Sequence, residues 1–189
     1  MIRILLALSL MLSFSACAKS DSPDEKSATD AQSPKSTATG QYAADIKGAT
    51  GESLGLVFFL PTPNGVLLSA SLQGLPEGEH AFHIHAKGTC APDFGAAGGH
   101  FAPNSEPHGF KVEGGPHAGD MPNIYVPSSG ELIFEVFNPR VSLFETPNAL
   151  FDEDGSAIMI HAGPDDYESQ PSGAAGSRFG CGVISQTNG

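Results

Sequence analysis

The sequence predicts an all-β domain, a β-sandwich or flattened barrel of eight short strands. Short β-rich runs are separated by turn sequences such as PNG at residues 63–65 and DEDG at residues 152–155. No helical period continues beyond two turns. Short strands punctuated by Gly and Pro are typical of sandwiches and barrels. The predicted strands are residues 42–47, 54–60, 66–72, 80–85, 124–126, 132–137, 157–161 and 179–185.

Two long segments between these strands, residues 86–123 and 162–177, contain no strand pattern. Loops of this length in a compact domain are usually functional. We therefore expect the functional residues in and beside these two loops.

The first 40 residues differ from the rest of the chain. Residues 1–17 combine one Arg, an apolar run over residues 4–14 and small residues, which is typical of a secretory signal. That run is shorter than the about 20 residues that cross a bilayer. Residues 18–40 contain no Leu, Ile, Val or Phe, and this composition predicts disorder. We interpret the segment as a tether, although an ordinary ragged terminus is equally consistent with the composition. Residues 41–189 remain as the single folded domain.

The segment around Cys17 has two interpretations. Cys17 follows Phe14, Ser15 and Ala16, which is similar to a bacterial lipobox, although Phe14 stands where Leu is usual. A lipidated Cys17 would anchor the chain to a membrane of the bacterial envelope, and we favour this interpretation. Residues 16–18 could instead be the A-x-A site of ordinary signal peptidase, which would give a soluble periplasmic protein. Both interpretations predict export.

The formal net charge of −12 argues against nucleic-acid binding, which needs a basic surface. The two other cysteines, Cys90 and Cys181, form an even pair in an exported chain, which predicts a disulfide. A metal site with two cysteines is disfavoured, because neither has a second cysteine nearby. No apolar stripe decides between a monomer and a homodimer.

Six of the seven histidines fall into one spaced constellation with an aspartate. Clustered imidazoles bind zinc, copper, iron or nickel, and seven ligands are too many for one ion. The pattern therefore predicts a site for two metals. Its residues are His83, His85, His100, His108, His117, Asp120 and His161.

Strand parity separates ligand histidines from packing histidines, because positions i and i+2 share one face of a strand. His83 and His85 are expected to project together, away from the core side of Ile84. His80 has the parity of Ile84, so we expect a structural role for it. On the later strand, His161 has the parity that leaves it free to complete the site.

Five segments resemble the copper,zinc superoxide dismutase family in its bacterial secreted form. They are GEHAFHIHAKGTC, AGGHFAPN, GGPHAGDMPN, MIHAGPDDY and GSRFGCGVI. The gaps of 15, 8, 9 and 3 residues from His85 through His100, His108 and His117 to Asp120 also match. The resemblance covers nearly all of residues 42–185 and implies the family's Greek-key sandwich.

The resemblance implies a copper site and a zinc site that share one imidazolate, that of His100. Four imidazoles suit Cu(II), and three His with one Asp form a closed zinc shell. The implied copper ligands are His83, His85, His100 and His161. The implied zinc ligands are His100, His108, His117 and Asp120.

The implied reaction converts superoxide to molecular oxygen and hydrogen peroxide at copper. His100 would leave reduced copper, carry a proton and return when copper is reoxidised. Arg178 would dock the superoxide anion, and Asp165 would hydrogen-bond one ligand of each metal. Residues 162–177 contain acidic residues but no Lys or Arg, so Lys87 is the nearest cationic candidate for steering superoxide towards the site. Lys87 could equally be a solvated loop charge.

Two other function classes fit the sequence less well. A non-catalytic metal store of the same family would be expected to lose Arg178 or a ligand, and none is lost. A cupin-type site also uses His-x-His on a barrel, but it expects Glu where this chain has Thr89 and Cys90.

Overall fold

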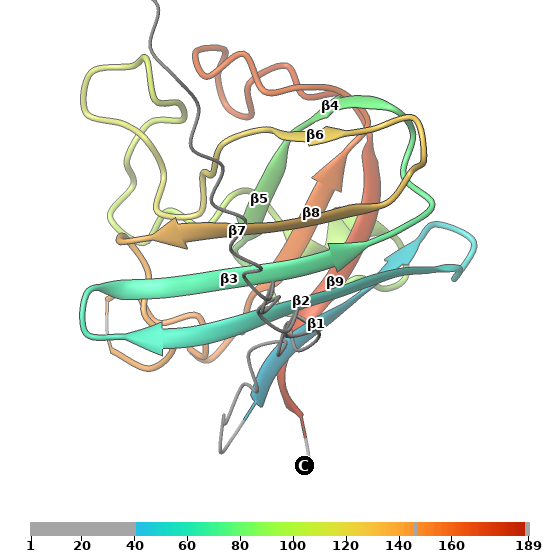
Figure 1. Ribbon diagram of the computed structural model, residues 1–189. Helices are drawn as coiled ribbons and strands as arrows, with labels where there is room; N and C mark the ends of the chain where they lie inside the picture. The colour runs from blue at the N-terminus through green and yellow to red at the C-terminus, as the bar shows by residue number, and fades with distance from the viewer. Residues whose placement is uncertain (1–40, 146, 188–189) are drawn as a thin grey trace, which may run out of the picture. The chain divides into compact units, whose positions relative to one another are not determined.

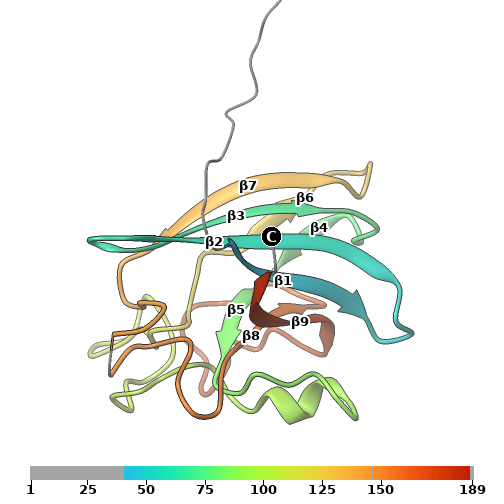
Figure 2. The same cartoon turned by 90° about the horizontal axis from the view of Figure 1, so that it is seen from below.

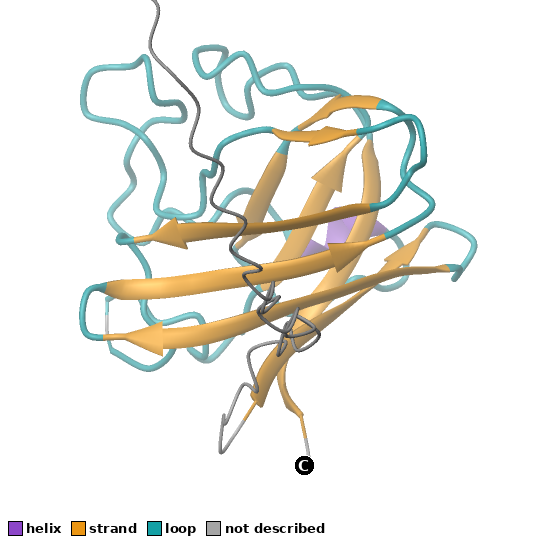
Figure 3. Cartoon of the chain, in the orientation of Figure 1, coloured by secondary structure: helices purple, strands orange, loops and turns teal. Residues whose placement is uncertain are grey.

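A computed structural model describes residues 41–145 and 147–187 of the 189-residue chain. The predicted signal segment, tether and lipidated Cys17 lie outside the described residues. Within the described part the chain forms β-strands and one short 3₁₀ helix, so the all-β prediction is confirmed (Figure 3). No described helix is long and apolar enough to cross a membrane.

The described residues form nine strands rather than eight. Most lie within one or two residues of their predicted ends, and the predicted strand at residues 80–85 is divided at Ala81. The elements are β1 (Gln41–Gly48), β2 (Ser53–Thr62), β3 (Gly65–Leu72), β4 (Gly78–His80), β5 (Phe82–His85), η1 (Phe94–Ala97), β6 (Ile124–Val126), β7 (Leu132–Asn138), β8 (Ala157–His161) and β9 (Arg178–Thr187).

The division at Ala81 has a hydrogen-bonding cause. The N–H of Ala81 donates to the carbonyl of Gly163 at 2.9 Å, and its carbonyl accepts from the N–H of His161 at 3.0 Å. On one side of this point β4 pairs with β6, and on the other side β5 pairs with β8. Periodicity could not show this change of partner, because the side-chain pattern continues through it.

Seven strands form one antiparallel sheet in the order β5-β8-β9-β1-β2-β3-β7, and β4 pairs with β6 in a second, small sheet. The large sheet curls, so that β7, β3 and β2 lie in a layer over β9, β8 and β5 (Figures 1 and 2). Strands β7 and β9 return by long connections to flank the β1–β2–β3 meander, which is a Greek-key arrangement.

The core lies between the two layers. Strand β2 alternates between exposed and buried residues over much of its length, as expected for a sheet with one solvated face. Every residue of β5 and β8 is buried, because one face packs on the core and the other carries histidines covered by loops. The rings of Phe82 and Phe134 meet edge to face at 5.3 Å and join the layers.

A third long connection, residues 139–156, has no strand among its described residues, although the sequence predicted only two such loops. It places the buried Val141, Leu143 and Leu150 in the main hydrophobic core. This segment therefore contributes to the hydrophobic core.

Candidate metal centre and substrate pocket

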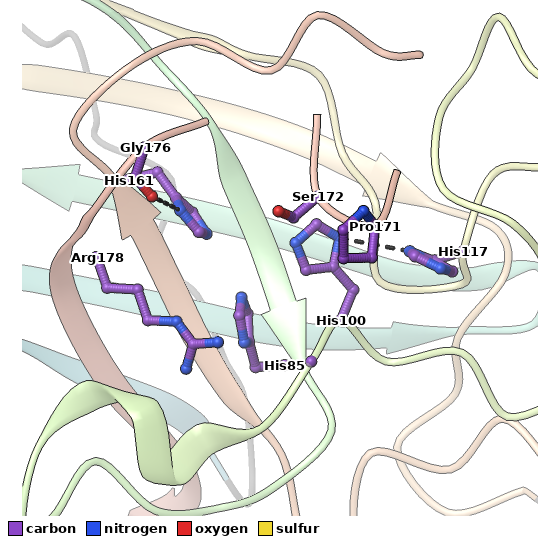
Figure 4. A pocket seen from close by; sticks show the side chains of 9 residues that line it. His85, His100, His117, His161, Pro171, Ser172, Gly176 and Arg178 are labelled. Atoms are coloured by element: carbon purple, nitrogen blue, oxygen red, sulfur yellow. Dashed lines mark hydrogen bonds between the residues drawn. The ribbon is translucent and has the colours of Figure 1, made fainter. Parts of the chain in front are cut away.

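The strand ladder places three of the histidines. In the pairing of β5 with β8, His83 lies opposite Met159 and His85 lies opposite Ala157. His161 ends β8, opposite Arg178 at the start of β9. The side chains of His85, His161 and Arg178 converge with that of His100 (Figure 4).

His100 comes from the first long loop but is fixed to the same strand. It forms a bridge with His85, and the N–H of Phe101 donates to the carbonyl of Ile84 at 2.9 Å. The N–H of Ile84 in turn donates to the carbonyl of Gly119 at 2.9 Å. A Cβ on Gly119 would lie 2.3 Å from the carbonyl oxygen of Ile84, so this position requires glycine. Two separate loop segments therefore lie directly on β5.

One group of four histidines has the geometry of a copper site. Its potential ligand atoms lie within 4.8 Å of one another, on His83, His85, His100 and His161. Four nitrogens in this group are buried without a hydrogen-bond partner: His83 Nδ1, His85 Nε2, His100 Nε2 and His161 Nε2. Unpaired buried polar atoms are rare, and four convergent imidazole nitrogens fit a bound copper ion.

The opposite ring nitrogens of this group have fixed partners. His85 Nδ1 lies 3.0 Å from the carbonyl oxygen of Gly98, and His83 Nε2 lies 2.9 Å from Asp165 Oδ2. An N–H donated at one nitrogen leaves the lone pair of the other for a metal. Burial lowers the pKa of His85 to about 2 and that of His161 to about 4. Both rings are thus neutral near pH 7, the form that binds metals.

The second group has the geometry of a zinc site and comes entirely from the first long loop. Its members are His100, His108, His117 and Asp120. Asp120 Oδ1 lies 2.7 Å from His100 Nδ1 and 3.2 Å from His117 Nδ1, and these two nitrogens are 3.4 Å apart. Ligand atoms of a tetrahedral zinc ion with bonds of about 2.0–2.1 Å are about 3.3 Å apart. The separations of 3.2 and 3.4 Å match this spacing, and the 2.7 Å separation is that of a hydrogen bond.

The ionisation of this group also suits a cation. Burial alone would raise the pKa of Asp120, but hydrogen bonds from His100, His117 and Gly109 outweigh it and leave the pKa below its usual range. Burial lowers the pKa of His100 to about 4. The group therefore offers a neutral His100 imidazole and a carboxylate at Asp120.

Asp165 connects the two groups. Its Oδ2 accepts from His83 Nε2 and its Oδ1 accepts from His108 Nε2, both at 2.9 Å. Burial raises the pKa of Asp165, but the hydrogen bonds, led by that from His83, lower it to about 2. Gly173 covers this carboxylate, and a Cβ there would lie 1.8 Å from Asp165 Oδ1.

Two residues that support Asp165 were missed in the sequence. The amide of Asn123 accepts from the N–H of Asp165 and donates to its carbonyl, both at 2.9 Å. The N–H of Asn123 donates to the hydroxyl of Tyr167 at 2.7 Å. An Asn in a loop and a lone Tyr carry no periodicity, so no signal in the sequence distinguished them.

Arg178 lies at a pocket of about 310 Å³ beside both groups (Figure 4). Its guanidinium donates to the carbonyls of Phe94 and Gly98, at the two ends of η1. The predicted disulfide, Cys90–Cys181, is present and packs with Phe94 against Ala157 and Met159 of β8. Other residues that line the pocket are His85, His100, His117, His161, Pro171 and Ser172.

Outside the pocket, Lys87 is exposed and its side chain lies against Gly98. Within the described residues its ammonium makes no hydrogen bond or ion pair. Lys111, for which the sequence predicted no role, donates to the carbonyl of Asp166 at 2.9 Å. His80 lies outside both groups, with its two ring nitrogens 2.9 Å from the carbonyl oxygens of His161 and Pro76.

The family model described as copper/zinc superoxide dismutase matches residues 54–184. The chain belongs to this family. Superoxide dismutase 2 of the Cu-Zn type from Aquifex aeolicus is 47% identical over 144 residues, which are 75% of this chain and 84% of that protein. The Cu-Zn superoxide dismutase of Caulobacter vibrioides is 43% identical over 145 residues, covering 75% of this chain and 83% of that one.

Solved structures of the family share the fold. A superoxide dismutase-like protein from Bacillus subtilis superposes with a TM-score of 0.73 at 36% identity, covering 76% of this chain and 97% of that one. The Cu/Zn enzyme of Brucella abortus has a TM-score of 0.63 at 29% identity, covering 76% and 98%. Family membership confirms the predicted family, the superoxide dismutase class of enzyme, and copper and zinc as cofactors.

Proposed function

We propose that the chain dismutates superoxide to oxygen and hydrogen peroxide at a copper ion that shares the His100 imidazolate with a zinc ion. One observation supports the assignment of His100 as a ligand of both metals: it presents a different ring nitrogen to each group. Its buried Nε2 has no partner and faces the histidines of β5 and β8, while its Nδ1 lies 2.7 Å from Asp120 Oδ1. Both ring nitrogens of one imidazole become ligands only where two cations flank it.

Copper supplies the one-electron oxidation and reduction, since zinc does not change oxidation state. The residues of the chain hold and orient the reactants. Arg178 keeps its guanidinium at the pocket through two carbonyls, and its remaining N–H groups can bind an anion beside the copper group. His100 Nε2 is the atom placed to hold a proton whenever it is not bound to copper.

The alternative, a non-catalytic metal store, is not favoured. The Bacillus subtilis protein to which this chain is 33% identical over 189 residues is named only as superoxide dismutase-like. In this chain both metal-binding groups are complete and Arg178 lines the pocket beside them. A storage protein would have no need for an arginine at the pocket beside the two groups.

The test is superoxide consumption by the purified chain together with its metal content. We expect one copper and one zinc per chain and a rate that is lost when copper is removed. Stoichiometric binding of both metals without superoxide consumption would favour the storage protein instead.

The proposal extends to location: residues 1–17 direct export, residues 18–40 form the tether to the domain at 41–189, and a lipidated Cys17 anchors the enzyme to the bacterial envelope. The signal composition and the lipobox-like segment support this. In the native host, Cys17→Ser should release the protein from the membrane fraction or block its processing. A mature N-terminus at Lys19 would instead identify a soluble periplasmic enzyme.

A further inference from the structure

The backbone of His108 is held by a side chain of the second long loop. The N–H of His108 donates to Gln170 Oε1 at 3.0 Å, and its carbonyl accepts from Gln170 Nε2 at 2.8 Å. The two residues are 62 positions apart. Within the described residues neither backbone group of His108 has another hydrogen-bond partner. The side-chain amide of Gln170 therefore supplies both the acceptor and the donor that a neighbouring β-strand would supply to the backbone of His108.

Two other members of its group, unlike His108, are tied to β5 by backbone bridges. His100 forms a bridge with His85 of β5, and Asp120 forms a bridge with His83. His108 makes no such bridge. Its ring is fixed by Asp165, which lies in the same loop as Gln170. The second loop thus holds His108 both by its ring and by its backbone.

The two loops also meet beyond His108. The N–H of Lys111 donates to the carbonyl of Tyr167 at 3.1 Å, and the rings of Phe110 and Tyr167 lie 5.3 Å apart. A Cβ on Gly109 would lie 2.2 Å from the carbonyl oxygen of Tyr167, so the two backbones touch there. These contacts hold Tyr167 beside residues 109–111. Gln170, three residues after Tyr167, is thereby placed within hydrogen-bonding distance of His108.

Gln170 immediately precedes the segment that borders the pocket. Pro171 and Ser172 line the pocket next to His100 and His117 (Figure 4). The two hydrogen bonds between Gln170 and His108 therefore fix the chain just before Pro171 to a residue of the zinc group.

We propose that Gln170 is a positioning residue that fixes His108, and through it zinc, to the loop that borders the substrate pocket. This inference rests on the assignment of His108 to zinc. Residues that orient metal ligands typically change metal affinity by about 10–100-fold when they are replaced. Because Gln170 is an exposed residue, water can replace part of the lost hydrogen bonding, and we expect an effect near the lower limit.

The test measures the zinc dissociation constant of the full chain by competition with a colorimetric chelator. Gln170→Ala should raise this constant about tenfold, while the unfolding midpoint of the metal-free protein stays near that of the wild type. Gln170→Glu keeps the acceptor for the His108 N–H but loses the donor to the His108 carbonyl. Its zinc dissociation constant should therefore lie between those of the wild type and Gln170→Ala. Gln73→Ala, an exposed glutamine after β3, is the matched control and should bind zinc as the wild type does.

Cobalt(II) bound in place of zinc adds a spectroscopic measurement, because its visible absorption depends on coordination geometry. The bands should change in Gln170→Ala and not in Gln73→Ala. A Gln170→Ala variant with the zinc affinity and cobalt spectrum of the wild type would overturn the inference alone. A wild-type chain that binds no zinc would overturn the zinc assignment itself. Should Gln170→Ala not fold, Gln170→Glu gives the same comparison.

Discussion

The two metal-binding groups are built in different ways. In the copper group, three of four residues lie on β5 and β8, where backbone pairing sets their positions. In the zinc group, all four residues lie in the first long loop. The strand-built group is held by the backbone pairing of β5 with β8 and of β8 with β9. The loop-built group depends on contacts with Asp165 and Gln170, and we expect it to depend more on its ion.

His100 belongs to both the strand-built copper group and the loop-built zinc group. It belongs to the loop by sequence, but its bridge with His85 ties it to the ladder. Asp165 adds a second connection, from His83 on the strand to His108 in the loop. The two groups are therefore coupled by a shared ligand and by a shared carboxylate.

The largest effect is expected for His100→Ala, because His100 is the residue common to both groups. The variant should lose most of its superoxide consumption and should bind both metals more weakly. His117→Ala, which removes a residue of the loop-built group alone, should lose zinc and retain copper. Metal analysis after dialysis, with a superoxide-consumption assay, checks both. His80→Gln is the control and should keep both metals; copper loss from folded His80→Gln would show that the parity argument is wrong.

A smaller effect is expected for Asp165→Asn, which keeps the shape of the side chain but removes the charge that accepts from His83 and His108. Zinc affinity should fall by about 10–100-fold, and copper affinity should fall less, because the ladder still holds His83. Competition with chelators for each metal measures this difference. Equal losses at both metals would contradict the contrast between strand-built and loop-built groups.

At the pocket, Arg178→Ile should reduce the superoxide rate severalfold or more with both metals retained. Arg178 lies in neither group, so its loss removes anion docking and leaves the ligands in place. The comparison of rate with metal content in one preparation checks this. Metal loss in the variant would instead assign Arg178 a role in holding η1 against the copper group.

The smallest effect is expected for Lys87→Glu. Lys87 is exposed beside the pocket of an acidic chain, so its reversal should lower the rate less than Arg178→Ile does. The deficit should shrink as salt rises, since added ions screen exposed charges beyond about 8–10 Å. A rate equal to that of the wild type at low ionic strength would make Lys87 a solvated loop residue only.

The same contrast explains what the sequence could predict. Parity placed His83, His85 and His161 correctly, because a strand repeats every two residues. No period exists in residues 86–123, so the division of the seven residues into a copper set and a zinc set, with His108 and Asp120 in the zinc set, rested on the resemblance to the family. The short helix η1, the change of partner at Ala81 and the cross-loop amides of Asn123 and Gln170 depend on contacts between distant segments. Such contacts leave no local pattern.

The shared role of His100 is tested most directly by the paramagnetic resonance spectrum of copper during zinc addition. Copper-loaded, zinc-free protein would be titrated with zinc while the copper spectrum is recorded. Our account predicts that the spectrum changes in proportion to bound zinc and is constant after one equivalent. A copper spectrum unchanged by stoichiometric zinc binding would show that His100 does not join the two ions.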